Sequence, residues 1–192
     1  KGETVFETGS PSESAPTPSI NTLTVPRGGM FPLKLSDGTK VWLNSDSELT
    51  FPDSFEADNR TVKLKGEAFF DIVPDLQRPF MIETQDIRIK VTGTSFNVRH
   101  YHDEEAASVA VVDGTVTVDL EGRVACAKVT PGLQFSINGE TGEYSLTKAD
   151  LYKITAWKNN LFVFAEDDLS TIARSIERWY DVTIHVDETL CN

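Results

Sequence analysis

Cysteine is nearly absent from this chain of 192 residues, which holds only Cys126 and Cys191. Two isolated cysteines form neither a CxxC pair nor a metal-binding spacing, so the sequence predicts no zinc site and no disulfide framework. A disulfide between these two residues stays an open alternative, because it depends on an oxidising compartment as well as on their distance in the fold.

Long hydrophobic runs and positive charge are scarce too. The longest aliphatic cluster is the segment 109–112, far short of the roughly 20 apolar residues that span a bilayer. Lysine and arginine number 18 against 30 acidic residues, which gives a net charge of −12. Such a surface repels phosphate backbones and anionic lipids, so neither nucleic acid nor a membrane surface is an expected partner.

Catalytic signatures are missing as well. The chain has no G-x-S-x-G, no H-E-x-x-H and no phosphate-binding loop with its lysine. His100 and His102 would share one face of a strand, but a metal site needs a third ligand beside them. Acidic runs such as 103–105 are typical of solvated loops, although a hydrolase with paired carboxylates is a further alternative. We therefore expect a protein that is not an enzyme and that uses no cofactor or metal.

The N-terminal residues, 1–21, are predicted to be a linker. Nine of the twelve residues from 8 to 19 are serine, threonine or proline, and no apolar periodicity is present. Such a segment buries too little apolar surface to offset the entropy lost on ordering. Its composition suits a spacer that holds a domain away from something upstream.

Residues 22–150 are predicted to form a β-domain. Short runs rich in β-branched residues alternate apolar and polar side chains, as at 61–65 and 115–120, which indicates half-buried strands. Asp-Gly pairs at 37–38 and 113–114 are candidates for hairpin turns, because glycine accepts the positive φ of a tight turn. Strand-sized runs about ten residues apart predict a mainly β fold, either an antiparallel β-sandwich or a solenoid-like β-domain.

Residues 151–192 are expected to form a small α+β unit with a strand–helix–strand arrangement. The apolar run 161–164 is predicted to be a strand, and apolar residues recur at helical spacing over 169–180. An aspartate just before this helix is suited to cap it. The alternating segment 182–186 is predicted to be a second strand. So small a unit leaves strand edges open, so self-association through an edge is a further expectation.

One turn has a reactive chemical interpretation. Gly93 and Thr94 follow the predicted strand 87–91, and a hydroxyl residue directly after glycine can attack the preceding carbonyl when the backbone is strained. The resulting N-to-O acyl shift gives an ester that water then cleaves. An ordinary turn is the alternative that spacing alone favours.

Five motifs in collinear order resemble the extracytoplasmic region of FecR-type anti-sigma factors. They are TVPRGG at 24–29, LSDGTKVWLN at 35–44, LKGEAFF at 64–70, VTGTSFNV at 91–98 and WYDV at 179–182. The resemblance extends from about residue 22 to 188. It implies a β-rich domain on the periplasmic side of the inner membrane, in a single-pass protein whose upstream helix and cytoplasmic domain precede these residues.

The resemblance also implies partners and a cleavage site. In that family a cytoplasmic N-terminal domain holds an extracytoplasmic-function sigma factor. The periplasmic part senses the small signalling domain of a TonB-dependent outer-membrane transporter. Some members cleave themselves at a Gly-Thr bond that corresponds to Gly93-Thr94. Residues 1–21 would then follow the membrane helix, and 151–192 would begin a C-terminal interaction domain of two βαβ-like halves, similar to the short domain of secretins and TonB-dependent receptors.

Partner contact is expected either on the β-domain or on the C-terminal unit, by strand addition at an exposed edge. The candidate contact residues lie on the predicted strand and at the helix end: Leu161, Phe162, Val163, Phe164, Trp179 and Tyr180. Their alternative role is core packing, because apolar residues at helical period usually face inward.

A carbohydrate-binding β-module is the alternative function. Sugar-binding β-sandwiches often use exposed aromatic side chains, and Trp42, Trp157 and Phe51 are available. A flat row of these aromatics on one sheet face would support that function, and their burial would remove it.

Overall fold

The computed structural model describes residues 18–85, 87–120 and 126–186, so most of the predicted linker and Cys191 lie outside the described residues. Over these residues the chain forms thirteen strands, followed by three helical segments. The strands are β1 (Ile20–Val25), β2 (Phe31–Lys34), β3 (Lys40–Leu43), β4 (Ser47–Pro52), β5 (Arg60–Asp71), β6 (Phe80–Glu83), β7 (Ile87–Val91), β8 (Ser95–His100), β9 (Ala106–Asp113), β10 (Val116–Leu120), β11 (Cys126–Val129), β12 (Leu133–Asn138) and β13 (Tyr144–Lys148).

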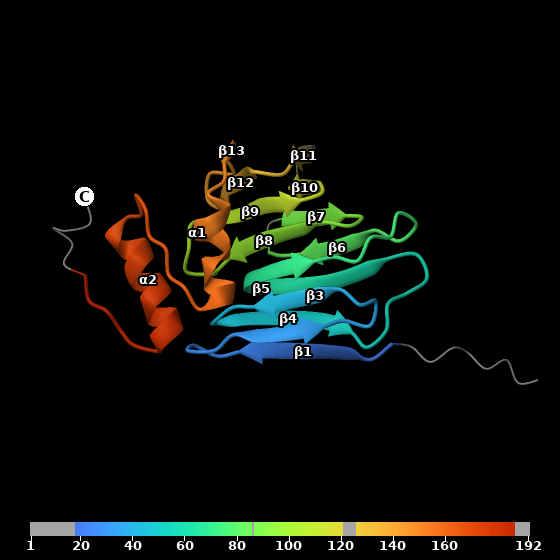
Figure 1. The fold of residues 1–192 in the computed structure, drawn as a ribbon, viewed down its shortest axis with the longest axis horizontal. Coiled ribbons are helices and arrows are strands. Elements are labelled where there is room, and N and C mark those ends of the chain that lie inside the picture. Colours follow the sequence, from blue (N-terminus) through green and yellow to red (C-terminus); the bar gives the residue numbers. More distant parts are fainter. Residues whose placement is uncertain (1–17, 86, 121–125, 187–192) are drawn as a thin grey trace, which may run out of the picture.

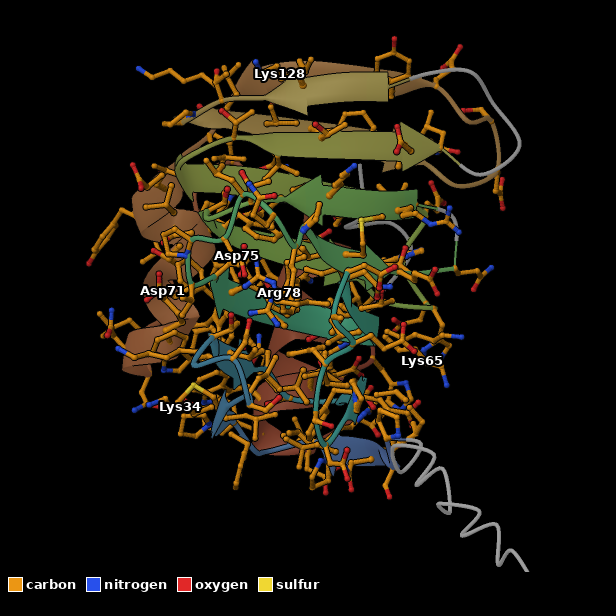
Figure 2. The ribbon with its side chains drawn as sticks, turned by 90° about the vertical axis from the view of Figure 1, so that its right-hand side faces the viewer. Lys34, Lys65, Asp71, Asp75, Arg78 and Lys128 are labelled. Carbon is orange, nitrogen blue, oxygen red and sulfur yellow. The ribbon has the colours of Figure 1, made fainter. Side chains whose placement is uncertain are left out.

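The strands form two layers that share β5. In sheet A the order is β1-β4-β5-β6-β7-β10-β11, and in sheet B it is β2-β3-β5-β8-β9-β12-β13. Figure 1 shows the strands stacked from β1 at one end to β11 and β13 at the other. Figure 2 places Lys65, on the sheet A half of β5, across the molecule from Asp71 and Lys34, which belong to sheet B.

The topology combines the two architectures that the sequence predicts. Successive antiparallel hairpins alternate between the layers: β6–β7 and β10–β11 in sheet A, β8–β9 and β12–β13 in sheet B. The mainly β class is confirmed. The exception to antiparallel pairing is β5–β6, which is parallel. Of the two Asp-Gly turns, 37–38 joins the paired strands β2 and β3, whereas 113–114 leads from sheet B to sheet A and is not a hairpin.

One core fills the space between the layers, because the apolar sides of both sheets face inward. Val62 and Leu64 of β5 are each 1% exposed and pack in the same cluster as Phe70 and Phe96. The rings of Phe70 and Phe96 stack with centroids 5.6 Å apart. Burial of side chains of this size stabilises a fold by about 1.5–3 kcal/mol each, so the alternation at 61–65 predicted its strand correctly.

Gly66 allows β5 to pass from one layer to the other. Its φ is +91°, and a Cβ there would lie 2.3 Å from Ser47 Oγ and 2.9 Å from the carbonyl oxygen of Asp46. Only glycine fits such a close approach at positive φ. The bend turns the following residue, Glu67, onto the outer face of sheet B.

The C-terminal segment consists of α1 (Leu151–Thr155), the 3₁₀ helix η1 (Ala156–Asn159) and α2 (Leu169–Tyr180). Asp168 caps α2 by accepting a hydrogen bond from the Thr171 amide at 2.8 Å, which confirms the predicted helix and its aspartate cap. None of the helices in the described residues is long and apolar enough to cross a membrane.

The two strands predicted beside this helix are wrong. Within the described residues, neither 161–164 nor 182–186 is part of a sheet. Alternation indicates an extended backbone, but a strand also needs a second one at hydrogen-bonding distance, and no strand in the described part of the chain lies at that distance from these segments. In contrast, α1 and η1 were not predicted, although Asp150 as a cap and the spacing of Ile154 and Trp157 indicate a helical turn.

The C-terminal segment covers the outer face of sheet B. α1 lies against β9, and α2 lies farther out, beyond the ends of the strands (Figure 1). Trp157 of η1 donates from Nε1 to Asn97 Oδ1 of β8 at 3.3 Å. The ammonium group of Lys158 lies 3.2 Å from the ring centroid of Phe69 and 5.2 Å from that of Trp42.

Candidate recognition surface and its attachment

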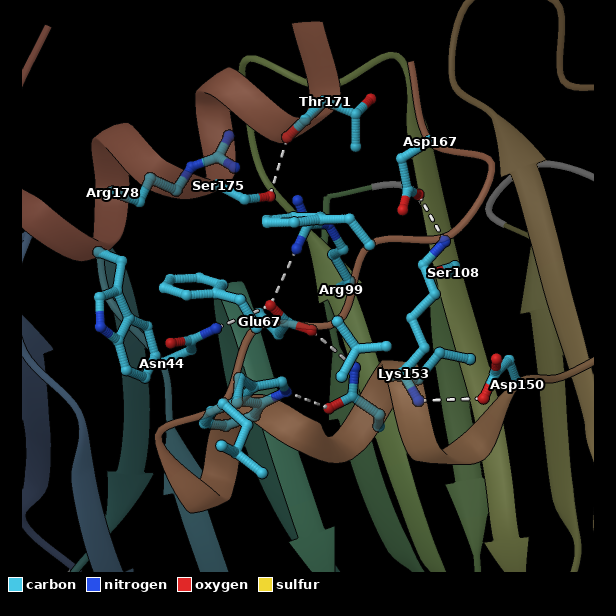
Figure 3. A pocket seen from close by; sticks show the side chains of 18 of the residues that line it. Asn44, Glu67, Arg99, Ser108, Asp150, Lys153, Asp167, Thr171, Ser175 and Arg178 are labelled. Atoms are coloured by element: carbon cyan, nitrogen blue, oxygen red, sulfur yellow. Dashed lines mark hydrogen bonds and ion pairs between the residues drawn. The ribbon is translucent and has the colours of Figure 1, made fainter. Parts of the chain in front are cut away.

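A cavity of about 400 Å³ separates the outer face of sheet B from the C-terminal segment (Figure 3). Polar residues of β5, β8, β9 and β12 form its floor, and α1, the segment 161–164 and α2 form its walls. The cavity therefore marks the junction between the β-domain and the C-terminal unit.

The carboxylate of Glu67 is the centre of the polar floor and is 3% exposed. Asn44 Nδ2 donates to its Oε2 at 2.9 Å, and Asn97 Nδ2 donates to its Oε1 at 2.9 Å. Arg99 Nη1 donates to Oε2 at 3.0 Å. A buried charge is costly unless it is paired and hydrogen-bonded, and here both oxygens are satisfied. Asn44, Glu67 and Asn97 come from three of the five sequence motifs, which the fold brings to one point.

Arg99 extends this network to the β8–β9 loop. Its Nε and Nη2 donate to Glu104 Oε2 and Oε1 at 2.8 and 2.6 Å, a two-point contact that fixes both side chains. Burial favours the neutral form of Arg99, but the charges of Glu67 and Glu104 outweigh it and raise the pKa of the guanidinium. Tyr101 lies beside the pair, and its hydroxyl donates to the Ser45 carbonyl at 2.8 Å.

Arg178 of α2 completes the network from the other side of the junction. The residue is 3% exposed, and its guanidinium donates to Glu104 Oε1 at 2.6 Å and to Asp103. Its Cζ lies 3.7 Å from the ring centroid of Tyr101. Burial raises the pKa of Asp103, but the charge and hydrogen bond of Arg178 outweigh it, so the pKa lies below its ordinary value of 3.8.

The orientation of α2 explains why Arg178 was not predicted. Thr171, Ser175 and Arg178, which share one side of the helix, line the cavity. Leu169 and Tyr180 lie on the opposite side and are 40% and 61% exposed. Apolar residues at helical period usually face inward, but the outer face of sheet B is polar here and pairs with the polar side of α2. Arg178 could have been predicted only by matching the positive charge on the polar side of α2 with the acidic residues Asp103 and Glu104 of the β8–β9 loop.

The six predicted contact residues lie close together. The Phe162 ring centroid is 5.6 Å from that of Phe164, 4.9 Å from that of Trp179 and 6.1 Å from that of Tyr180. We call these four residues the aromatic cluster. Phe164 is 39% and Tyr180 61% exposed, whereas Phe162 and Trp179 are half-buried.

The remaining two contact residues belong to the extended segment beside the aromatic cluster. Leu161 is 47% exposed, and Val163 lines the cavity. The Leu161 amide donates to the Ala156 carbonyl at 3.3 Å. Among the described residues, no backbone hydrogen bond joins Phe162, Val163 or Phe164 to another residue. Within the described residues, this segment therefore offers backbone groups outside any sheet next to exposed aromatic rings.

Gly93 and Thr94 lie in the β7–β8 turn. Gly93 has φ +152°, and a Cβ there would lie 2.8 Å from Pro74 Cα. Thr94 is 3% exposed; its hydroxyl donates to the Thr115 carbonyl at 3.0 Å and accepts from the Thr115 amide at 3.3 Å. A Cβ on Gly114 would lie 2.7 Å from both the Gly93 oxygen and Thr94 Oγ1. The two turns thus pack tightly, and the backbone of Thr115 holds the hydroxyl.

The aromatics proposed for sugar binding do not form an exposed row. Trp157 is 7% exposed, Phe51 packs against the core, and Lys158 covers Trp42. The carbohydrate-binding alternative is therefore wrong for these three residues. Among the described residues, no group of three histidine, cysteine or acidic side chains is arranged to hold a metal ion.

Comparisons with known proteins agree on one family. The family described as FecR protein matches residues 21–117, and the family described as FecR, C-terminal, matches residues 161–192. Two solved structures of a candidate anti-sigma factor from Parabacteroides distasonis ATCC 8503 are similar. The one at 2.50 Å resolution has a TM-score of 0.84 and 32% identity, over 89% of this chain and 79% of that chain. The one at 1.65 Å has a TM-score of 0.80 and 33% identity, over 84% and 75%. A search of curated proteins gives no significant match.

Proposed function

Because this chain belongs to the FecR family of anti-sigma factors, we propose that it is the periplasmic sensor region of a membrane-anchored regulator. Its input is the signalling domain of a TonB-dependent outer-membrane transporter, and its output is the state of a sigma factor held by a cytoplasmic domain upstream. The region acts by protein–protein contact. The family assignment supports a regulatory sensor role, and the transporter and the sigma factor are the proposed partners.

The orientation of α2 carries this proposal. The polar side of α2 faces the β-domain through Arg178, while Leu169 and Tyr180 on its other side are 40% and 61% exposed. Large apolar side chains grouped on a surface mark a site of protein contact. The aromatic cluster is therefore the part of the chain that best suits the signalling domain.

The extended segment 161–164 offers a second mode of contact. Its backbone makes no sheet pairing within the described residues, so a strand of the signalling domain can add beside it. Strand addition supplies affinity through main-chain hydrogen bonds, and the neighbouring aromatic rings supply specificity. The same open edge would pair with a second copy of the chain when the signalling domain is absent.

A reporter for sigma-dependent transcription tests the proposed function in cells. Tyr180→Ser in the full-length protein is expected to abolish the response to the ligand of the transporter, because it removes the most exposed ring of the aromatic cluster. Tyr152 of α1, which is 67% exposed, offers a matched control: Tyr152→Ser is expected to leave the response unchanged. A normal response in the Tyr180→Ser strain would contradict the proposal.

Self-cleavage between Gly93 and Thr94 is proposed as a single-turnover event of this sensor. The positive φ of Gly93 and the close packing of Gly114 against this bond support it. Thr94 Oγ1 would attack the Gly93 carbonyl carbon, the C–N bond would break to free the Thr94 amine, and water would hydrolyse the ester. The step requires the hydroxyl to leave its two hydrogen bonds with Thr115.

A further inference from the structure

The C-terminal end of α2 touches the loop that follows the first strand. The amide of Gly28, between β1 and β2, donates to the Arg178 carbonyl at 2.7 Å. A Cβ on Gly28 would lie 3.8 Å from the Trp179 carbonyl oxygen and 3.9 Å from the Asp181 Cβ. Segments from the two ends of the described chain therefore meet beside the aromatic cluster.

Arg178 thus makes two different connections. Its backbone oxygen binds the loop 26–29, while its side chain binds Asp103 and Glu104 of the β8–β9 loop and stacks on Tyr101. The side chains of Arg178 and Glu104 are 4% and 12% exposed, so losing Arg178 removes one charged partner from a mostly buried carboxylate, which then keeps Arg99 alone. Arg178 is therefore expected to contribute more to the docking of α2 than an exposed ion pair would.

β1 is the edge strand of sheet A. Within the described residues its pairing is with β4 alone, and its residues from Ile20 to Thr22 are exposed. Its far end is anchored by Val25, which is 4% exposed, and by the loop 26–29. Two contacts hold that loop. The Arg178 carbonyl accepts a hydrogen bond from the Gly28 amide, and the Ser45 hydroxyl donates to the Gly29 carbonyl at 2.6 Å.

Binding of a partner to the aromatic cluster would weaken the contacts that hold α2 on the β-domain. Phe162 and Trp179 are half-buried and line the cavity under α2. A partner that covers all four rings gains more contact when α2 moves away from the β-domain, so it binds the undocked state more tightly. Trp179 directly follows Arg178, so a partner cannot draw it out without disturbing the Arg178 contacts.

We propose that Arg178 couples the docking of α2 to the retention of β1, so that a partner that binds the aromatic cluster loosens the strand next to the N-terminal linker. The proposal rests on the proposed function for the identity of that partner. The coupling itself is a property of the chain alone and is tested without any partner.

Hydrogen exchange measured by mass spectrometry on the chain alone tests the coupling. In Arg178→Ala, peptides covering 20–29 are expected to exchange about tenfold faster than in the unmodified protein, while peptides covering 95–100 keep their rates. Arg174 is one turn earlier on α2, and its guanidinium donates to the Thr171 hydroxyl of the same helix at 3.3 Å. Arg174→Ala is therefore the matched control and should leave 20–29 unchanged.

A second variant keeps the test decisive if Arg178→Ala unfolds the whole domain. Asp103→Asn removes one Arg178 partner, whose side chain is 34% exposed, and is expected to speed exchange in both α2 and 20–29 by a smaller factor. Faster exchange in α2 with an unchanged rate at 20–29, in either variant, would overturn the coupling. Such a result leaves the proposed function intact. Failure of the signalling domain to bind would instead overturn the proposed function and leave the coupling between α2 and β1 intact.

Discussion

Arg178 of α2 and Glu104 of the β8–β9 loop are 2.6 Å apart between Nη1 and Oε1, and the carboxylate of Glu104 also holds Arg99. This carboxylate joins the C-terminal helix to the buried network of the β-domain. The chain Asn44–Glu67–Arg99–Glu104–Arg178 is continuous in hydrogen bonds. Three successive hydrogen-bonded contacts therefore connect Arg178 of α2 to Glu67, which belongs to the motif at 64–70.

The Glu67 network is expected to be essential for stability. Glu67→Ala removes the buried carboxylate to which Arg99, Asn44 and Asn97 donate hydrogen bonds. We expect it to lower the free energy of unfolding by about 3–5 kcal/mol. Equilibrium unfolding in urea measures this loss. Glu48 pairs with Lys65 at 2.8 Å on the surface, and Glu48→Gln should cost no more than about 1 kcal/mol. Equal losses in the two variants would show that the buried network is not special.

The bend in β5 gives a prediction with an internal control. Gly66→Ala places a Cβ 2.3 Å from Ser47 Oγ at φ +91°, so we expect a loss of about 3 kcal/mol or more. Gly132 has φ +81° but nothing within 4 Å of its Cβ position. Gly132→Ala should therefore cost only the conformational term of about 1–2 kcal/mol. Thermal unfolding of both variants separates the two effects, and a Gly66→Ala protein as stable as Gly132→Ala would refute the steric explanation.

Stability is expected to fall in acid through Asp103. Arg178 lowers the pKa of Asp103 in the folded state below its ordinary value of 3.8. A lowered pKa contributes stability that is present above the unfolded value and is lost as pH falls through the folded value. The difference in melting temperature between the unmodified protein and Asp103→Asn should thus be constant above about pH 5 and shrink below pH 4. A difference that grows as the pH falls would contradict the assigned interaction.

The Gly93–Thr94 bond is expected to break without any added protease. Intact mass measurements over several days should show fragments that end at Gly93 and begin at Thr94. Thr94→Val lacks the attacking oxygen and should stay intact. If the unmodified chain stays intact as well, or if Thr94→Val breaks at the same rate, the proposed acyl shift is wrong.

Strand addition predicts a strong effect of proline in the extended segment. Val163→Pro removes a main-chain donor from 161–164 and should weaken binding of the signalling domain at least tenfold. Surface plasmon resonance with the signalling domain immobilised measures the change. Binding by Val163→Pro as tight as that of the unmodified chain would show that partner contact does not use this backbone.

Local patterns predicted the elements better than their partners. Alternation at 61–65 gave a strand because a half-buried strand has one apolar side, and Asp168 marked the start of α2 because an aspartate caps helix amides. The parallel pairing of β5 with β6 and the route of 113–114 between the layers depend on residues distant in sequence. Local pattern carries no information on these contacts.

The candidate site was predicted in part for the same reason. The aromatic residues were named from composition and spacing, and the structure brings their rings together, while their contact with a partner stays a prediction. Arg178 was missed because its partners, Asp103 and Glu104, are far away in sequence and because a polar helix side that faces inward reverses the usual rule. The convergence of Asn44, Glu67 and Asn97 likewise becomes visible only when β3, β5 and β8 lie side by side.

Calorimetric titration of this chain with the signalling domain of the transporter encoded beside it tests the central proposal most directly. We expect saturable binding by the unmodified chain and by Tyr152→Ser, and an affinity at least tenfold lower for Tyr180→Ser, because burial of a large aromatic ring contributes about 1.5–3 kcal/mol. Absence of binding, or equal affinities for Tyr180→Ser and Tyr152→Ser, would contradict recognition through the aromatic cluster.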